Sequence, residues 1–162
     1  MNKTEKIIII VAVVVAICIL IYMAIAKNAG KYVYYLTKSG QGTSNELIED
    51  YDTFNKRVSS LGIEERLENK IDFSKSNISE IFTEEYFNDK KVAIISTHED
   101  TAKSYMYSVD KVEYNSDKTT ATIYYTDKAG EYLGPLKNSW YNYMLVEVAG
   151  TVTNVDFVKN AE

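Results

Sequence analysis

The residues best equipped for chemistry are His98, Glu99 and Asp100, which follow one another in the chain. A histidine held by a neighbouring carboxylate can act as a general base. Adjacent side chains on a turn point in different directions, however, and the chain contains no small-x-Ser-x-Gly sequence to supply a nucleophile. We therefore expect an ordinary loop between a strand that ends at Ser96 and another that starts at Ser104. A hydrolase that uses His98 stays open as an alternative.

No metal site or cofactor is predicted. Cys18, the only cysteine, lies in an apolar segment, and with a single histidine in the chain a zinc site is nearly excluded. Three aspartates lack the spacing of a calcium loop, and two carboxylate pairs fall where helices begin or face solvent. These residues are Asp110, Asp117 and Asp127, and the pairs Glu49 with Asp50 and Glu84 with Glu85.

Aromatic side chains are in surplus, with 14 tyrosines and a cluster at Trp140-Tyr141-Asn142-Tyr143. Tyrosine combines an apolar face with a polar tip, which suits the recognition of proteins or sugars. The same rings could instead fill and flank a small sheet, since aromatic residues favour strands. The candidate contact residues for a partner or a glycan are Trp140, Tyr141, Tyr143 and Tyr132.

The charge of the chain argues against nucleic acid as a ligand. The net charge of the whole chain is −5, and without Lys3, Lys6 and Glu5 the rest carries 16 basic and 22 acidic side chains, a net of −6. Such a domain repels nucleic acid and anionic lipid headgroups. Protein and glycan partners remain open. The abundance of Lys, Asn, Ile and Tyr is typical of bacteria with low-GC genomes.

Residues 7–26 are predicted to form a transmembrane helix. They include no charged residue, and 20 residues at 1.5 Å each reach about 30 Å, the thickness of a bilayer core. Residues 1–6 would then be a cytoplasmic head, with one soluble domain, residues 27–162, outside a single-pass cell-membrane anchor that contacts lipid. Ala24-Ile25-Ala26 also fits a signal peptidase site, so secretion after cleavage following Ala26 is the alternative.

The soluble part is predicted to be one α+β domain. Thr43 and Glu46 have the form of a capping box at the start of an amphipathic helix that Gly62 ends. Short helices or turns are expected from Ile63 to Lys90. Period-two patterns and short apolar runs predict five or six antiparallel strands, on which the helix packs. These runs are Lys31–Lys38, Val92–Ser96, Tyr105–Tyr114, Thr120–Thr126, Tyr143–Ala149 and Val152–Val158.

Three connections follow from this pattern. Asn115-Ser116-Asp117 and Ala149-Gly150 are predicted to be hairpin turns. Asp127–Ser139 is expected to be a long polar loop, which in a small domain is functional or mobile. Tyr143–Ala149 is mostly apolar on both faces and is expected at the centre of the sheet.

The C-terminal half resembles the PrcB-like C-terminal domain family, named after an accessory subunit of a bacterial surface protease complex. The resemblance lies in Tyr86-Phe87-Asn88-Asp89-Lys90 before the strand Val92–Ile95, in Tyr105–Val109, and in Trp140–Val148. It implies a non-enzymatic, extracytoplasmic module that steadies another protein. We therefore expect an accessory or protein-binding domain with an envelope protein as its partner, and a cell-wall or glycan-binding module as the alternative.

Overall fold

The computed structural model describes residues 10–19, 30–37, 42–63, 78–101, 103–132 and 138–160, with the backbone alone for 36–37, 99–101, 103–106, 127–132 and 138–140. After a helix at residues 10–19, the elements in chain order are β1 (Tyr32–Thr37), β2 (Glu46–Ile48), α2 (Tyr51–Leu61), α3 (Ile78–Ile81), the 3₁₀ helix η1 (Glu85–Asn88), β3 (Lys90–Thr101), β4 (Lys103–Tyr114), β5 (Thr120–Tyr132), β6 (Asn138–Ala149) and β7 (Asn154–Asn160).

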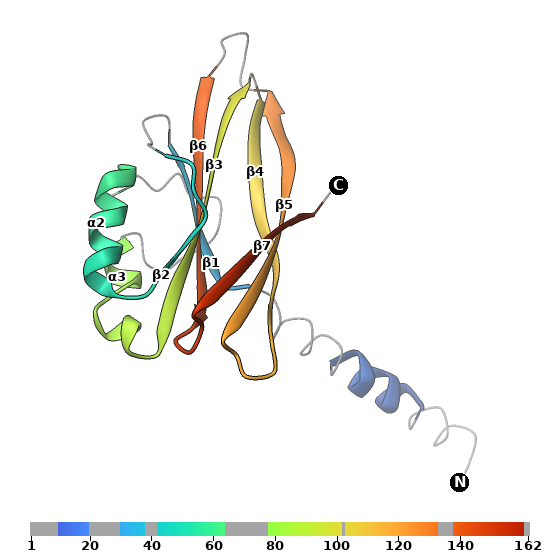
Figure 1. The fold of residues 1–162 in the computed structure, drawn as a ribbon. Helices are drawn as coiled ribbons and strands as arrows, with labels where there is room; N and C mark the ends of the chain where they lie inside the picture. The colour runs from blue at the N-terminus through green and yellow to red at the C-terminus, as the bar shows by residue number, and fades with distance from the viewer. Residues whose placement is uncertain are drawn as a thin grey trace.

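The α+β class is confirmed, but the prediction of a single antiparallel sheet of five or six strands is wrong. In the described residues seven strands form two sheets, ordered β1-β6-β3-β2 and β4-β5-β7. The pairings are antiparallel except for β7, which runs parallel to β5. Figure 1 shows α2 and α3 on one side of the four-stranded sheet and the three-stranded sheet on the other. The domain therefore has three layers.

Two sheets form because β3 and β6 are apolar on both faces. Successive side chains of a strand point to opposite faces, so such a strand needs a cover on each side. One face packs against the helices and the other against β4 and β5. The helix-facing residues include Val92, Ile94, Tyr143 and Leu145, and those facing the second sheet include Ala93, Ile95, Met144 and Val146. The predicted central place of Tyr143–Ala149 is confirmed, since β6 lies between β1 and β3.

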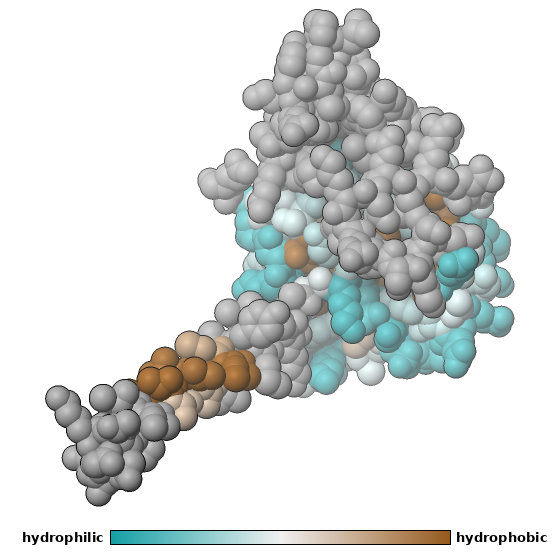
Figure 2. Space-filling view, turned by 180° about the vertical axis from the view of Figure 1, so that it is seen from behind, coloured by the Kyte–Doolittle hydropathy of each residue, from teal (hydrophilic) through white to brown (hydrophobic). Residues whose placement is uncertain are grey.

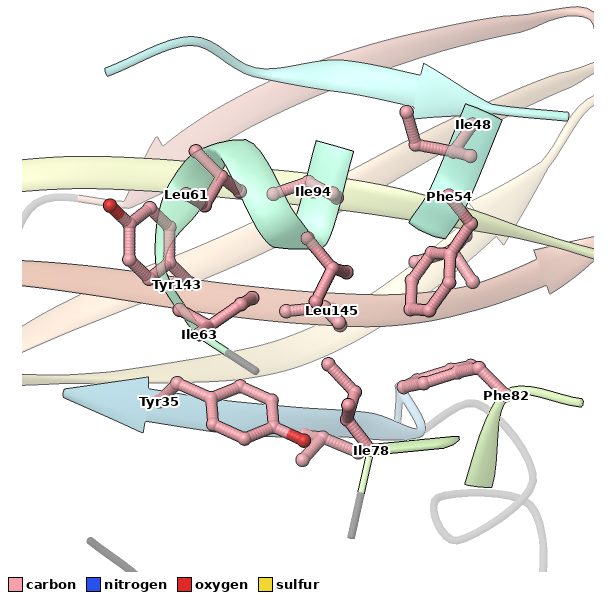
Figure 3. Close-up of a cluster of buried hydrophobic side chains, with 13 residues drawn as sticks. Tyr35, Ile48, Phe54, Leu61, Ile63, Ile78, Phe82, Ile94, Tyr143 and Leu145 are labelled. Carbon is pink, nitrogen blue, oxygen red and sulfur yellow. The ribbon is translucent and has the colours of Figure 1, made fainter. Parts of the chain in front are cut away.

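The main helix begins later than predicted. Asp50 is its N-cap, accepting hydrogen bonds from the Thr53 backbone N–H and hydroxyl at 2.8 Å each, and the helix ends as predicted at Gly62, whose φ is +71°. Phe54, Val58 and Leu61 face the core, as the amphipathic spacing predicted. Figure 3 shows Phe54 and Leu61 beside the side chains of the sheet.

The predicted capping box at Thr43 is wrong because the residues after it form β2. Glu46 and Ile48 pair with Ile94 and Val92 of β3, which buries Ile48 in the core. Glu46 forms an ion pair with Arg57 of α2 instead of capping a helix. Short helices were expected before β3, and α3 and η1 confirm them; residues 64–77 lie outside the described part.

The predicted turn at Asn115-Ser116-Asp117 is confirmed between β4 and β5, where Lys118 N–H donates to the Asn115 carbonyl at 3.1 Å. Ala149-Gly150 is also a turn, but not a hairpin, because β7 crosses to the second sheet and pairs with β5. The loop predicted at Asp127–Ser139 is wrong in extent: β5 continues to Tyr132 and β6 begins at Asn138.

Residues 10–19 form a helix whose side chains are all exposed. Figure 2 shows this helix in brown, next to mostly hydrophilic residues on the coloured part of this face of the domain. Among the described residues, no helix is both long and apolar enough to cross a membrane. The rest of the predicted span, residues 7–9 and 20–26, lies outside the described part.

Candidate functional site

Two of the predicted contact residues, Trp140 and Tyr141, lie with His98 at one end of the four-stranded sheet. Tyr32 of β1 pairs with Val146 of β6, whereas Thr37 pairs with Tyr141. Tyr32 begins β1, so Val146 marks where the chain enters the sheet, and Tyr141 lies five residues away along β6. Because strands rise about 3.3 Å per residue, this separation is roughly 17 Å. We call this end of the sheet, formed by residues 98–101 of β3 and 138–141 of β6, the distal end.

At the distal end His98 and Tyr141 form a stacked pair. They are Cα partners in the β3–β6 register, and their ring centroids are 4.4 Å apart with 28° between the ring planes. His98 is exposed, while Tyr141 is half-buried and packs against the helix-facing core. The prediction that His98 lies in a loop is wrong: β3 runs to Thr101, so a cross-strand neighbour sets the position of the imidazole.

Within the described residues, the ring that contacts His98 is that of Tyr141. The side chains of Glu99 and Asp100 lie outside the described part. Ser96, two residues before His98, is buried, and its hydroxyl donates to the Gly42 carbonyl at 2.9 Å. Its backbone N–H donates to Asn45 Oδ1 at 3.2 Å. These two hydrogen bonds join the segment before β2 to β3, next to the stacked pair.

Tyr143, another predicted contact residue, lies inside the domain. Its side chain is fully buried in the helix-facing core, since a strand places residues two apart on one face and α2 covers that face here. Figure 3 shows its ring near Leu61 and Ile63. Trp140 lies in β6 opposite Glu99, and Tyr132 ends β5 opposite Lys103; the side chains of Trp140 and Tyr132 lie outside the described part.

A second surface feature was not predicted from the sequence. A hollow of about 400 Å³ beside the start of α2 combines the rings of Tyr51 and Phe87, 6.2 Å apart, with several acidic groups. Hydrogen bonds from Thr53 hold the pKa of Asp50 below its usual range. Within the described residues, no three His, Cys, Asp or Glu side chains are arranged to hold a metal ion. The acidic lining is Glu49, Asp50, Asp52 and Glu84.

Comparison of the chain with protein-family models, curated proteins and solved structures finds no match.

Proposed function

We propose that the chain is a membrane-anchored, extracytoplasmic accessory domain that binds and positions another envelope protein. The observation that carries the proposal is the exposed apolar helix at residues 10–19, whose larger aliphatic side chains are 50% to 62% exposed. Side chains of this kind are stable in a bilayer core and costly in water. In this proposal the helix is part of a membrane span of residues 7–26, and residues 27–162 lie outside the membrane.

The partner is proposed to bind at the distal end. This end lies away from the point where the chain enters the domain, so a partner can reach it above the bilayer. Tyr141 and His98 offer flat, partly exposed rings on the paired strands β3 and β6. Tyrosine is enriched where proteins meet, because its ring buries a large area at a low cost in side-chain entropy. The acidic domain favours a partner with a basic face. The resemblance to the PrcB-like family agrees with this role and stays a prediction.

The test is photo-crosslinking of the full-length protein in cells. A photoreactive amino acid at His98 should give one specific protein adduct, and Tyr141→Ala should abolish it. The matched control places the same amino acid at Asp156, which is exposed on β7. An adduct from Asp156 alone, or none from either position in membrane-bound protein, would contradict the proposed surface. The intact mass of the membrane fraction tests whether the anchor is retained or cleaved after Ala26.

Two alternatives have their own tests. Cell-wall or glycan binding predicts that Trp140→Ala weakens pull-down on cell-wall material, and an unchanged pull-down would remove it. A hydrolase predicts that His98→Ala abolishes an activity while the melting temperature stays the same.

A further inference from the structure

A groove lies at the end of the four-stranded sheet opposite the distal end, which we call the proximal groove. Its volume is about 410 Å³, within the range of sites that bind small molecules. Its walls come from the chain entry and β1, from the α3–η1 segment, and from β6. The lining residues are Gly30, Lys31, Tyr32, Val33, Ile81, Phe82, Tyr86 and Glu147.

The walls of the proximal groove are mainly apolar, and its charges lie together. Ile81 and Phe82 belong to the helix-facing side of the core, and the Tyr86 ring packs edge-on against Phe82 with centroids 5.1 Å apart. The two carboxylate oxygens of Glu147 face the ammonium groups of Lys31 at 3.8 Å and of Lys90 at 3.1 Å. This cluster places two ammonium groups beside the groove, with Asp89 as a second carboxylate nearby.

The hydroxyl of Tyr86 lies beside Glu147. Burial raises the pKa of Tyr86, and the nearby Glu147 carboxylate raises it further, so the hydroxyl keeps its proton. The groove therefore carries a neutral hydrogen-bond donor beside a carboxylate.

The position of the groove decides what can reach it. Gly30 lies four residues after Ala26, the last residue of the proposed span, and four residues extend at most about 14 Å. The groove therefore opens close to the lipid headgroups if the anchor is in place. We propose that the proximal groove binds an acyl chain of a phospholipid from the adjacent leaflet, with the headgroup phosphate at Lys31. This inference rests on the proposed membrane anchor.

The Lys31 side chain suits that role because it is 80% exposed and its pairing with Glu147 is long. A phosphate can approach the ammonium group without displacing a buried contact. The bound lipid would hold the proximal end of the domain against the bilayer and so fix the direction in which the distal end points.

The test uses the full-length protein in vesicles of phosphatidylglycerol that carries a diazirine near the end of one acyl chain. After illumination, mass spectrometry should locate lipid adducts on β1 and on Ile81 to Tyr86. Ile81→Trp fills the groove with an apolar ring, and because it displaces at least two methylene groups it should reduce these adducts about tenfold or more. Val158→Trp, the same type of change at an exposed aliphatic residue of β7, should leave them unchanged.

Lys31→Glu is the second variant, and it touches no buried side chain. It should reduce groove adducts in phosphatidylglycerol vesicles, with adducts in residues 7–26 unchanged. Adducts confined to residues 7–26 in the unmodified protein, or equal groove adducts in Ile81→Trp, would overturn the lipid site. Carbonate extraction of the same samples reports on the anchor separately. Protein that resists extraction but shows no groove adducts removes the lipid site alone, whereas protein released from the vesicles removes the anchor itself.

Discussion

Replacing Tyr35 with phenylalanine is expected to stabilise the domain. The Tyr35 side chain is 1% exposed, and its hydroxyl has no hydrogen-bond partner among the described residues. Figure 3 shows the ring within the helix-facing core. The unfolded chain hydrates this hydroxyl, whereas the folded chain buries it unpaired. Tyr35→Phe removes that penalty and keeps the ring.

The penalty for a buried, unpaired polar group is about 1 to 3 kcal/mol. The small void left by one oxygen atom offsets part of the gain. We therefore expect the free energy of unfolding to rise by about 1 to 2 kcal/mol, which for a domain of this size raises the melting temperature by roughly 3 to 8 °C. Urea unfolding of the full-length protein in mild detergent, followed by circular dichroism, should show a higher midpoint with an unchanged slope.

Tyr34→Phe is the matched control, because the same atom is removed from the neighbouring residue of β1. The Tyr34 hydroxyl donates to Oδ1 of buried Asn142, so its loss should destabilise the domain by about 1 to 3 kcal/mol. Opposite signs for the two variants support the structure. A loss of stability in Tyr35→Phe would show that its hydroxyl has an acceptor in solution and would refute the reasoning.

Three further predictions concern backbone packing and pH. Gly150→Ala should destabilise the domain by about 1 to 3 kcal/mol, measured by thermal melting, because a Cβ there would lie 2.8 Å from the Asp89 carbonyl. The pKa of Asp50 is lowered in the folded protein, so the charged carboxylate stabilises the fold above the unfolded pKa, and this stabilisation is lost as the pH falls. Asp50→Asn keeps a cap that does not titrate, so the urea midpoint of this variant should fall less on acidification. Burial raises the pKa of Tyr35 and Tyr86, so above about pH 10 the unfolded chain releases protons that the folded chain retains. The free energy of unfolding should therefore fall as the pH rises, and it should fall less steeply in Tyr35→Phe.

The local pattern of the sequence predicted most of the elements but not their assembly. The apolar spacing from Phe54 to Leu61 and the glycine at 62 predicted the body and end of α2. Its start was misplaced because the capping-box spacing of Thr43 and Glu46 is a local signal, whereas the ladder between β2 and β3 joins residues far apart in sequence. The long-range pairing prevailed, and Asp50 became the cap.

The second sheet was missed for a related reason. Both β3 and β6 are apolar on two faces, and this pattern required a cover on each side of the sheet. One amphipathic helix can cover only one of those faces. The strands that cover the other, β4 and β5, alternate as a half-buried sheet should, with Ala121, Ile123 and Tyr125 facing inward. That alternation predicted the strands without showing which sheet they join.

The sequence singled out both residues of the stacked pair, but for different roles. Tyr141 was predicted as a contact residue and His98 only as the residue of an alternative hydrolase. The alternation along β6 places Tyr141 and Tyr143 on one face. Whether a ring on that face is core or contact surface depends on how far α2 extends over the sheet, which no local pattern encodes. The stacking of His98 on Tyr141 depends on the β3–β6 register. Because His98 was expected in a loop, the sequence did not predict that it pairs with Tyr141.

The two proposed surfaces should act independently. Both lie at the ends of the four-stranded sheet, where side chains of its central strands emerge from between the covering layers. Tyr141 and Glu147 are six residues apart along β6, or roughly 20 Å, and perturbations separated by more than about 10 Å usually add. The double variant Tyr141→Ala with Ile81→Trp should therefore lose the partner adduct as fully as Tyr141→Ala alone and lose the lipid adducts as fully as Ile81→Trp alone. If Ile81→Trp alone also abolished the partner adduct while the melting temperature held, the groove would control partner binding, and the picture of two separate contacts on one rigid sheet would be wrong.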